Sequence, residues 1–202
     1  MDVLFSWTVK NHMEVFGAMA GIVYIFFEIR ASFWLWPVGI VTSAVYVWVF
    51  FNGKLYADMS LQVYYVVISI LGLVWWLKRM PHEDKKLRIT NLKLKTGAVL
   101  AVAFVILFAA MWAILKRFTD SPVPGCDALI TSLSVIATWM LARKILQHWF
   151  LWIIINATAV ILFITRELYP TAVLYAIYGV MSFVGLTEWR RNVKNELNAD
   201  EL

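Results

Sequence analysis

Two stretches of the chain carry the same pattern: residues 30–50 read RASFWLWPVGIVTSAVYVWVF, and residues 143–163 read RKILQHWFLWIIINATAVILF. Sliding the chain on itself by 113 residues aligns them without a gap, and the match continues across the next loop to residues 76 and 189. Fifteen identities result over residues 30–76, and they include Arg, Trp, Tyr, Ser and Gly. Shared hydrophobicity would explain only the coincident aliphatic residues, so the pattern indicates an internal repeat.

Both copies belong to a chain that is too apolar for a soluble fold. Of its 202 residues, 62% are hydrophobic and 15% are charged, and the mean hydropathy is +0.74. A soluble domain has about 45–50% apolar and about 25% charged residues, because polar groups must cover its surface. The composition excludes an ordinary soluble enzyme, a disordered chain and a nucleic-acid-binding protein, and it indicates a polytopic membrane protein. The single cysteine, Cys126, excludes an intramolecular disulfide and a thiolate metal cluster.

Seven nearly charge-free runs approach the roughly 20 residues that a bilayer-spanning helix needs. The first and fifth of them are short. Residues 1–13 are too polar for the apolar region of a cleavable signal, and we expect them to lie at the membrane interface. A turn outside the membrane is predicted at Pro122–Gly125. The runs cover residues 14–27, 33–51, 59–77, 96–115, 128–142, 146–165 and 171–188.

The repeat groups these spans into two units. Residues 14–77 form a first three-helix repeat, residues 128–189 form a second, and residues 96–115 form a linker helix between them. Because three is an odd number of spans, the linker helix is needed to make the two repeats parallel, related by an axis along the membrane normal. The predicted fold is an all-α polytopic membrane protein of seven transmembrane helices in a 3+1+3 arrangement. Bundles built from such repeats typically place a substrate near the midplane between the halves, which favours a transporter over a receptor or an enzyme.

The basic residues predict the orientation of the chain in the membrane. Of the 18 Lys and Arg residues, five lie in segments on the side of the N-terminus and thirteen on the other side. By the positive-inside rule the richer side is cytoplasmic, so the N-terminus is outside and the tail, residues 190–202, is inside. We interpret the basic loop, residues 78–95, as an orientation signal and not as a nucleic-acid-binding patch.

A W-x-x-W-x-x-x-N spacing on the sixth span marks a candidate binding face. It places Trp149, Trp152 and Asn156 within roughly 60° of one another around the helix. Since an Asn that faces lipid is poorly satisfied, we expect this face to look into the bundle and to contact a substrate. The alternative is that Asn156 bonds a neighbouring helix while the two Trp side chains pack against lipid or headgroups.

Matching stripes on the third and seventh spans supply further candidates. Small residues at positions 69, 72, 182 and 185 are expected to let helices approach closely. Polar side chains of these stripes are expected to contact an asymmetric substrate; the candidates are Gln62, Tyr65, Tyr175 and Tyr178, and the equivalent pair Gln62 and Tyr175 differs between the stripes. On the second span, Thr42 is a candidate too, although a hydrogen bond to its own helix is the alternative.

Other kinds of chemistry are not indicated. The sequence has no metal-ligand spacing, no phosphate-binding glycine-rich loop and no arrangement of nucleophile, base and oxyanion donors, so we predict no metal, no cofactor and no catalytic residue. Indole and phenol faces with nearby amides suit a flat aromatic ring that is neutral or cationic. Glu28 lies beside Arg30 at the expected cytoplasmic end of the first span, and we interpret it as part of a boundary ion pair and not as a proton-coupling group.

From about Phe16 to Arg190 the chain resembles the PnuC family of vitamin transporters. The most specific pieces are LYAD at 55–58 followed by LQV at 61–63, and ARK at 142–144 leading into WFLWIIIN at 149–156. The resemblance implies a fold similar to SWEET sugar transporters, a homotrimer, and uniport of nicotinamide riboside across a bacterial inner membrane with trapping by a cytoplasmic kinase. It also implies substrate contacts at Trp149, Trp152, Asn156 and Gln62.

The chain departs from the family pattern on the second span. An Asn expected there is Thr42, next to the sequence Trp36-Pro37-Val38-Gly39. We therefore include Thr42 and Trp36 among the expected substrate-binding residues, and thiamine or riboflavin is the alternative substrate, since relatives with altered sites carry them. A non-transporting membrane interaction protein is the alternative of a different class.

Overall fold

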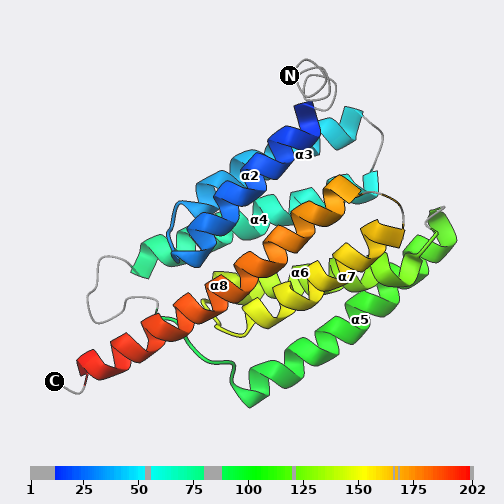
Figure 1. Ribbon diagram of the computed structural model, residues 1–202. Coiled ribbons are helices and arrows are strands. Elements are labelled where there is room, and N and C mark those ends of the chain that lie inside the picture. Colours follow the sequence, from blue (N-terminus) through cyan, green and yellow to red (C-terminus); the bar gives the residue numbers. More distant parts are fainter. Residues whose placement is uncertain are drawn as a thin grey trace. The chain divides into compact units, whose positions relative to one another are not determined.

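The computed structural model describes residues 12–52, 56–79, 88–119, 122–165, 167 and 169–200. In these residues the chain is helical, with one isolated bridge and no strand, which confirms the all-α prediction. The helices in Figure 1 are α2 His12–Ile29, α3 Leu35–Asn52, α4 Tyr56–Arg79, α5 Leu94–Phe118, α6 Pro124–Ala142, α7 His148–Thr165 and α8 Tyr169–Asp200.

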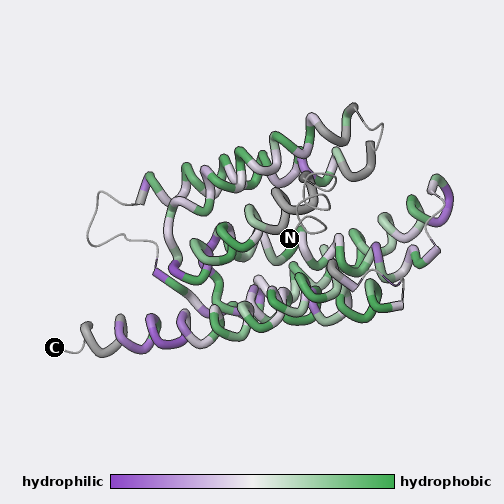
Figure 2. The backbone as a smooth tube through the Cα atoms, turned by 45° about the horizontal axis from the view of Figure 1, so that its top comes forward, coloured by the Kyte–Doolittle hydropathy of each residue, from purple (hydrophilic) through white to green (hydrophobic). Residues whose placement is uncertain are grey.

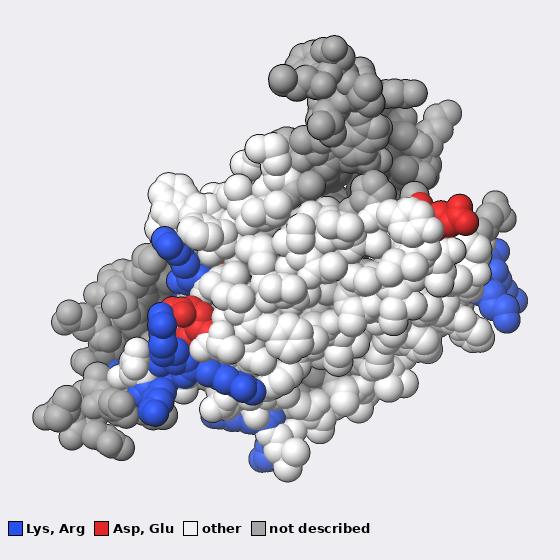
Figure 3. Space-filling view, in the orientation of Figure 1, with Lys and Arg blue, Asp and Glu red and all other residues white. Residues whose placement is uncertain are grey.

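Five of the described helices, α4 to α8, are long and apolar enough to cross a membrane. Helices α2 and α3 have 18 residues each, or about 27 Å at 1.5 Å per residue, close to the about 30 Å hydrocarbon core of a bilayer. Their apolar described stretches are shorter, Met19–Ile29 and Leu35–Trp48. Figure 2 shows hydrophobic residues along the bodies of the helices and hydrophilic residues at their ends. On the face drawn in Figure 3, charged side chains likewise leave a broad surface between them without charge.

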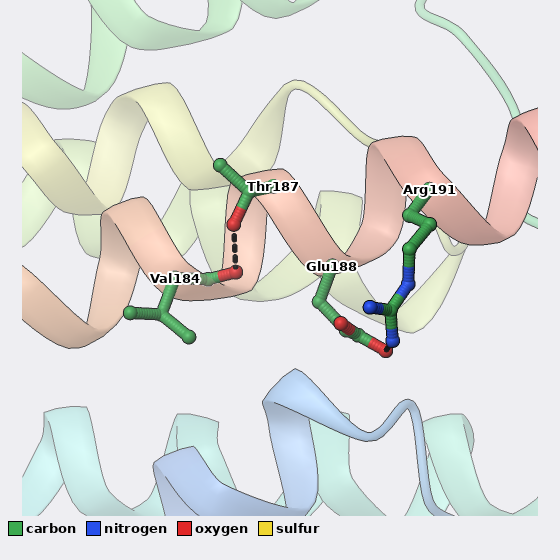
Figure 4. Close-up of polar contacts among 4 residues, drawn as sticks. All are labelled: Val184, Thr187, Glu188 and Arg191. Carbon is green, nitrogen blue, oxygen red and sulfur yellow. Dashed lines mark hydrogen bonds and ion pairs between the residues drawn. The ribbon is translucent and has the colours of Figure 1, made fainter.

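Two helices extend beyond their predicted spans by four residues or more. Helix α6 begins at Pro124, four residues early, because proline lacks an N–H that the first turn of a helix would leave unsatisfied anyway. Helix α8 continues to Asp200, through most of the expected tail. Figure 4 shows how its side chains support this continuation: Arg191 donates to Glu188 at 2.7 Å, and Thr187 donates to the carbonyl of Val184 at 2.8 Å.

Parts of the sequence-based predictions lie outside the described residues. Of the expected interfacial segment, residues 1–13, only the last two are described, and they begin α2. The basic loop at 78–95 is described as the end of α4, the residues from Arg88 onward and the start of α5. Leu55 of the LYAD motif also lies outside.

The chain divides into two compact units. The first unit, residues 1–78, contains α2, α3 and α4, and α2 packs against α3. The second unit, residues 79–202, contains α5 to α8; α6 packs against both α5 and α7, and α7 packs extensively against α8.

The helix boundaries follow the repeat found in the sequence. Helix α2 ends at Ile29 and α6 at Ala142, α3 and α7 begin at Leu35 and His148, and α4 and α8 begin at Tyr56 and Tyr169, each pair 113 residues apart. The ends of α3 and α7, at 52 and 165, keep the same interval of 113. We call this correspondence the repeat register.

The turns after α2 and α6 have the same hydrogen bonds. Ala31 and Lys144, equivalent in the repeat register, have φ angles of 48° and 51°, in the left-handed region. In each unit the N–H of this residue donates three residues back, at 3.0 Å and 2.8 Å, and the next N–H donates five residues back, at 3.0 Å and 2.9 Å. This is the Schellman pattern, which satisfies helix-end carbonyls and offsets the about 1–2 kcal/mol cost of a left-handed residue other than glycine. The first helices of the two units, whose sequences match only weakly, therefore end alike.

The second unit has an additional connection that joins two loops, which we call the loop clasp (residues 90–92 with residues 144–147). Thr90 donates to the carbonyl of Lys144 and accepts from the N–H of Leu146, both at 2.9 Å. The Gln147 side chain accepts from the N–H of Leu92 at 2.7 Å and donates to Asn91 at 3.1 Å. Leu92 also packs on the apolar cluster of Ile136, Met140 and Ile145. The clasp therefore ties the segment that leads into α5 to the turn between α6 and α7.

Candidate substrate-binding site

Trp149, the first Trp of the W-x-x-W-x-x-x-N spacing, is enclosed within the second unit. Its side chain is 0% exposed, and its ring meets that of Trp189 edge to face, with centroids 5.9 Å apart at 85°. A Cβ on Gly185 would collide with the Trp149 indole, so the glycine is what lets the ring lie against α8. Trp149 therefore joins α7 to α8, and its contact with a substrate stays a prediction.

Trp36 occupies the same place in the first unit. It is also 0% exposed, and its ring meets that of Trp76 edge to face, with centroids 5.5 Å apart at 88°. A Cβ on Gly72 would lie 2.6 Å from the Trp36 ring. The expectation that small residues of the third and seventh spans permit close approach is therefore met at Gly72 and Gly185.

Trp152, one turn further along α7, is in a different environment. It is half-buried, and it packs against the apolar cluster of Leu133, Ala137 and Ile155. Its indole nitrogen is buried and has no hydrogen-bond partner in the described part of the chain. A buried donor without an acceptor costs about 1–3 kcal/mol. The indole nitrogens of Trp36 and Trp149 are buried in the same way, so the feature that distinguishes Trp152 is its half-buried ring.

Asn156 is held by the neighbouring helix. It is 5% exposed, and its amide nitrogen donates to the Ser182 hydroxyl at 3.2 Å, which in turn donates to the carbonyl of Tyr178 at 2.8 Å. This is the neighbouring-helix bond that the sequence left open as an alternative. A primary amide has two donor hydrogens and two acceptor lone pairs, and Ser182 occupies one of these four. Because Asn156 lies four residues after Trp152, the two side chains share one face of α7.

The tyrosines of α8 form an aromatic row with α7. Tyr175 lies 5.2 Å from the ring of Phe163 and 5.8 Å from that of Tyr178. Both tyrosines are half-buried. The structure thus brings together Asn156 on α7 and the turn of α8 that carries Tyr178. Their contact with a substrate stays a prediction.

The first-unit candidates lie on α3 and α4. Gln62 and Tyr65 are half-buried on α4, and the Tyr65 ring lies 5.6 Å from that of Tyr64. Thr42 donates its hydroxyl hydrogen to the carbonyl of Val38 in its own helix at 2.8 Å, which was the stated alternative. Its oxygen can still accept a hydrogen bond.

Two polar residues have surroundings that the sequence did not reveal. His148 is 0% exposed, with its ring 4.7 Å from those of Trp149 and Trp189 and its Nδ1 2.8 Å from the carbonyl of Ile145. The repeat register pairs His148 with Leu35, which is also buried. This exchange of an apolar for a polar residue is the feature of the sequence that could have marked His148 as a buried polar residue. Glu28 is 2% exposed, while the Arg30 guanidinium lies over the ring of Phe26 at 4.3 Å.

The chain matches a known family over most of its length. Residues 11–191 match the model of a family described as nicotinamide mononucleotide transporter. The chain belongs to this family. Two relatives within it are nicotinamide riboside transporters PnuC: that of Escherichia coli is 24% identical over 201 residues, covering 88% of this chain and 84% of the relative. That of Neisseria mucosa is 22% identical over 203 residues, covering 95% and 77%.

A solved structure and a more distant relative extend the comparison. The crystal structure of the vitamin B3 transporter PnuC superposes with a TM-score of 0.74 at 20% identity, covering 96% of this chain and 87% of that one. The riboflavin/roseoflavin transporter RibM of Streptomyces davaonensis is 23% identical over 180 residues, covering 87% and 83%. The resemblance to the PnuC family is confirmed. The chain is therefore a multi-pass membrane transporter with the fold of PnuC, and not an enzyme.

Proposed function

We propose that this protein carries unphosphorylated nicotinamide riboside across a bacterial inner membrane. Two of its relatives are named for this substrate. The observation that carries the proposal is the half-buried indole ring of Trp152, which lies one turn from Asn156 on α7, whereas Trp149 on the same helix is enclosed. Nicotinamide riboside has a flat, positively charged pyridinium ring with a carboxamide, so it can stack on the indole and offer a carbonyl acceptor.

The remaining candidates divide into contact and supporting residues. In the second unit, Asn156 has hydrogen-bonding capacity left for the carboxamide, and Tyr175 and Tyr178 add phenols beside it. In the first unit, Gln62, Tyr65 and Thr42 are proposed to contact the same substrate. The enclosed Trp36 and Trp149 support these residues by keeping their helices in contact.

A nucleoside fits this chain better than a nucleotide, although the family description names the mononucleotide. Phosphate recognition in proteins relies on Arg or Lys side chains. The seven predicted spans contain neither residue. A phosphate drawn into the membrane would therefore have no cationic partner from these spans.

Transport is proposed to be passive. The sequence has no ATP-binding loop, so the vitamin runs down its own gradient and a cytoplasmic kinase traps it by phosphorylation. We propose that the protein is a homotrimer with the N-terminus outside and the C-terminus in the cytoplasm. The orientation is supported by thirteen of 18 basic residues on the C-terminal side.

The test is uptake of radiolabelled nicotinamide riboside into proteoliposomes without any imposed ion gradient. We expect internal and external concentrations to become equal, and enclosed kinase with ATP to raise accumulation above that level. Trp152→Ala should reduce the apparent affinity by about tenfold or more, as expected for the loss of one stacking partner. Trp48→Ala is the matched control, because this Trp is 69% exposed on α3.

Competition separates the alternative substrates. Unlabelled nicotinamide mononucleotide, thiamine and riboflavin are added in turn, and each should inhibit less than nicotinamide riboside. Riboflavin is the second candidate because RibM is also a relative. Stronger inhibition by thiamine or riboflavin would reassign the substrate, and no flux of any of the four compounds would favour a non-transporting role.

A further inference from the structure

One kind of contact between an arginine and an aromatic ring is repeated in both units. In the first unit the Arg30 guanidinium lies over the ring of Phe26, 4.3 Å from its centroid. In the second unit the Arg143 guanidinium lies over the ring of Trp139 at 5.5 Å. The two pairs are equivalent in the repeat register. A contact that both units keep belongs to their shared scaffold.

A different contact of this type joins two helices of the second unit. The Arg190 guanidinium of α8 lies over the ring of Phe150 on α7, 5.5 Å from its centroid. The equivalent positions of the first unit hold Leu77 and Pro37, which cannot form such a contact. The pair of Arg190 and Phe150 is therefore a feature of the second unit that the shared scaffold does not explain.

Buried neighbours hold this pair at the surface of the unit. Trp189, which precedes Arg190, is 0% exposed and meets the enclosed Trp149, which precedes Phe150, edge to face. Arg190 and Phe150 themselves are exposed. The two tryptophans therefore keep α7 and α8 together, while the adjacent pair presents a cation and a ring on the outside.

The pair lies at the level of the lipid headgroups. Phe150 is in the first turn of α7, which is long and apolar enough to cross a membrane, and Arg190 lies just past the predicted span at 171–188. The long arginine stem lets the guanidinium reach the headgroups from this position. A guanidinium has five N–H donors, and their planar fork matches the oxygens of a phosphate.

Exposed apolar side chains continue from the pair toward the middle of the membrane. Ile154 lies one turn after Phe150 on α7 and is 48% exposed. Phe183 lies two turns before Arg190 on α8 and is 55% exposed. At spacings of four and seven residues, each shares a helix face with its member of the pair. The contact between Arg190 and Phe150 joins these two faces, which together offer an apolar surface for acyl chains below a phosphate.

The surroundings of the pair are positively charged. The loop clasp brings the segment that carries the exposed Lys93 to the turn that carries the exposed Arg143. In the described stretches 88–95, 143–150 and 186–195 the acidic residue is Glu188, which forms an ion pair with Arg191 at 2.7 Å (Figure 4). Clusters of basic residues next to a membrane-spanning helix attract anionic lipids.

We propose that Arg190 and Phe150, with the apolar surface beside them, form a binding site for an anionic phospholipid of the leaflet on the side of the C-terminus. Arg190 donates to the lipid phosphate, Phe150 orients the guanidinium, and the acyl chains lie along Ile154 and Phe183. A lipid fits better than a soluble acidic partner, because the ring and the apolar surface belong to membrane-spanning helices. The inference is independent of which vitamin is carried.

The experiment is native mass spectrometry of the full chain in detergent with an equal mixture of phosphatidylglycerol and phosphatidylethanolamine that have the same acyl chains. The wild-type protein should retain phosphatidylglycerol in preference. Arg190→Gln should lower the apparent affinity for phosphatidylglycerol about fivefold, the effect expected for one basic side chain at an anionic lipid surface. Phe150→Leu should lower it about threefold, because an exposed cation–π contact is weaker. Arg191→Gln is the matched control, since it removes the same charge from the same helix at a residue that pairs with Glu188.

Each outcome decides the proposal. Equal retention of the two lipids by the wild-type protein overturns the site. Equal losses in Arg190→Gln and Arg191→Gln overturn it too, because they would show attraction by net charge alone. Excess inorganic phosphate should leave the bound lipid in place, and displacement would assign the site to a free anion and overturn the lipid. If Arg190→Gln does not fold, Phe150→Leu carries the test, and an unchanged lipid preference in that variant overturns the proposal.

Discussion

The first and second units share a scaffold and differ in side chains between their first two helices. In each unit a buried tryptophan lies against a glycine and meets a second tryptophan edge to face. The first unit uses Trp36, Gly72 and Trp76, and the second unit uses Trp149, Gly185 and Trp189. The turns after α2 and α6 also have the same backbone hydrogen bonds in both units. The units differ at two pairs of equivalent positions: Tyr24 corresponds to Ala137, and Gly39 corresponds to Trp152.

The difference teaches how a duplicated bundle can recognise an asymmetric molecule. Two identical faces would suit a symmetric ligand, whereas a vitamin with a charged ring and a sugar presents different groups on its two sides. Under the proposed function, the second unit contributes the indole of Trp152 and the amide of Asn156, and the candidates of the first unit are Gln62, Tyr65 and Thr42. The scaffold can stay the same because each large residue is matched by a small one on the facing helix.

The largest effect is expected from filling the two glycine sites. Gly72→Ala and Gly185→Ala each place a methyl group inside a buried indole, and such overpacking costs about 1–3 kcal/mol. Thermal unfolding in detergent should show similar losses for both, because the two units use the same contact. Gly125→Ala, where nothing lies within 4 Å of the added atom, is the control and should be neutral. If Gly72→Ala and Gly185→Ala lower the unfolding temperature by different amounts, the scaffolds of the two units are not equivalent.

An intermediate effect is expected from making the units alike at Asn156. Its equivalent in the repeat register is Ser43, so Asn156→Ser copies the first unit into the second. Interhelical hydrogen bonds in membranes average about 0.6 kcal/mol, so the midpoint of thermal unfolding should change little. The affinity for nicotinamide riboside should fall about tenfold, because the substrate loses an amide partner. A change in stability alone would show that Asn156 serves only the contact between helices.

The smallest effect is expected from the loop clasp, which the described residues show in the second unit. Gln147→Ala removes the acceptor of the Leu92 N–H and should lower the free energy of unfolding by about 1 kcal/mol. Hydrogen exchange at residues 90–92 should become faster, while exchange in α2 and α3 stays the same. The equivalent first-unit residue, Trp34, is 54% exposed, and Trp34→Ala should leave exchange at 90–92 unchanged. If residues 90–92 stay protected from hydrogen exchange in Gln147→Ala, the two backbone hydrogen bonds of Thr90 are sufficient to hold the loop clasp.

Helix positions were well predicted from the sequence because they depend on local features. Runs of apolar residues gave the α5 and α7 spans within a few residues, and the repeat gave the offset that the helix boundaries follow. The extension of α8 past Glu188 was missed, since a charged amphipathic segment is also compatible with a tail. The side-chain contact in this part of the helix is the ion pair between Arg191 and Glu188, three residues apart on its surface.

The candidate site was only partly predictable. The spacing of Trp152 and Asn156 on one helix face follows from helical geometry and needs no tertiary structure. That Trp149 is enclosed while Trp152 is not could not be predicted, because both are tryptophans on the same helix. Trp149 is covered because Gly185 on α8 lets the helices approach closely and because the rings of His148 and Trp189 lie against the indole.

By itself the sequence determined that this is a polytopic helical membrane protein with an internal repeat, because hydrophobic runs and coincident residues are properties of the chain read in order. The tertiary structure alone decided which rings are covered, which serine holds Asn156, and that the Tyr24 ring lies against Gly39 while Trp152 packs on the cluster of Leu133, Ala137 and Ile155. These contacts join residues far apart in the chain. Whether a side chain is scaffold or binding surface depends on the space that the facing helix leaves for it.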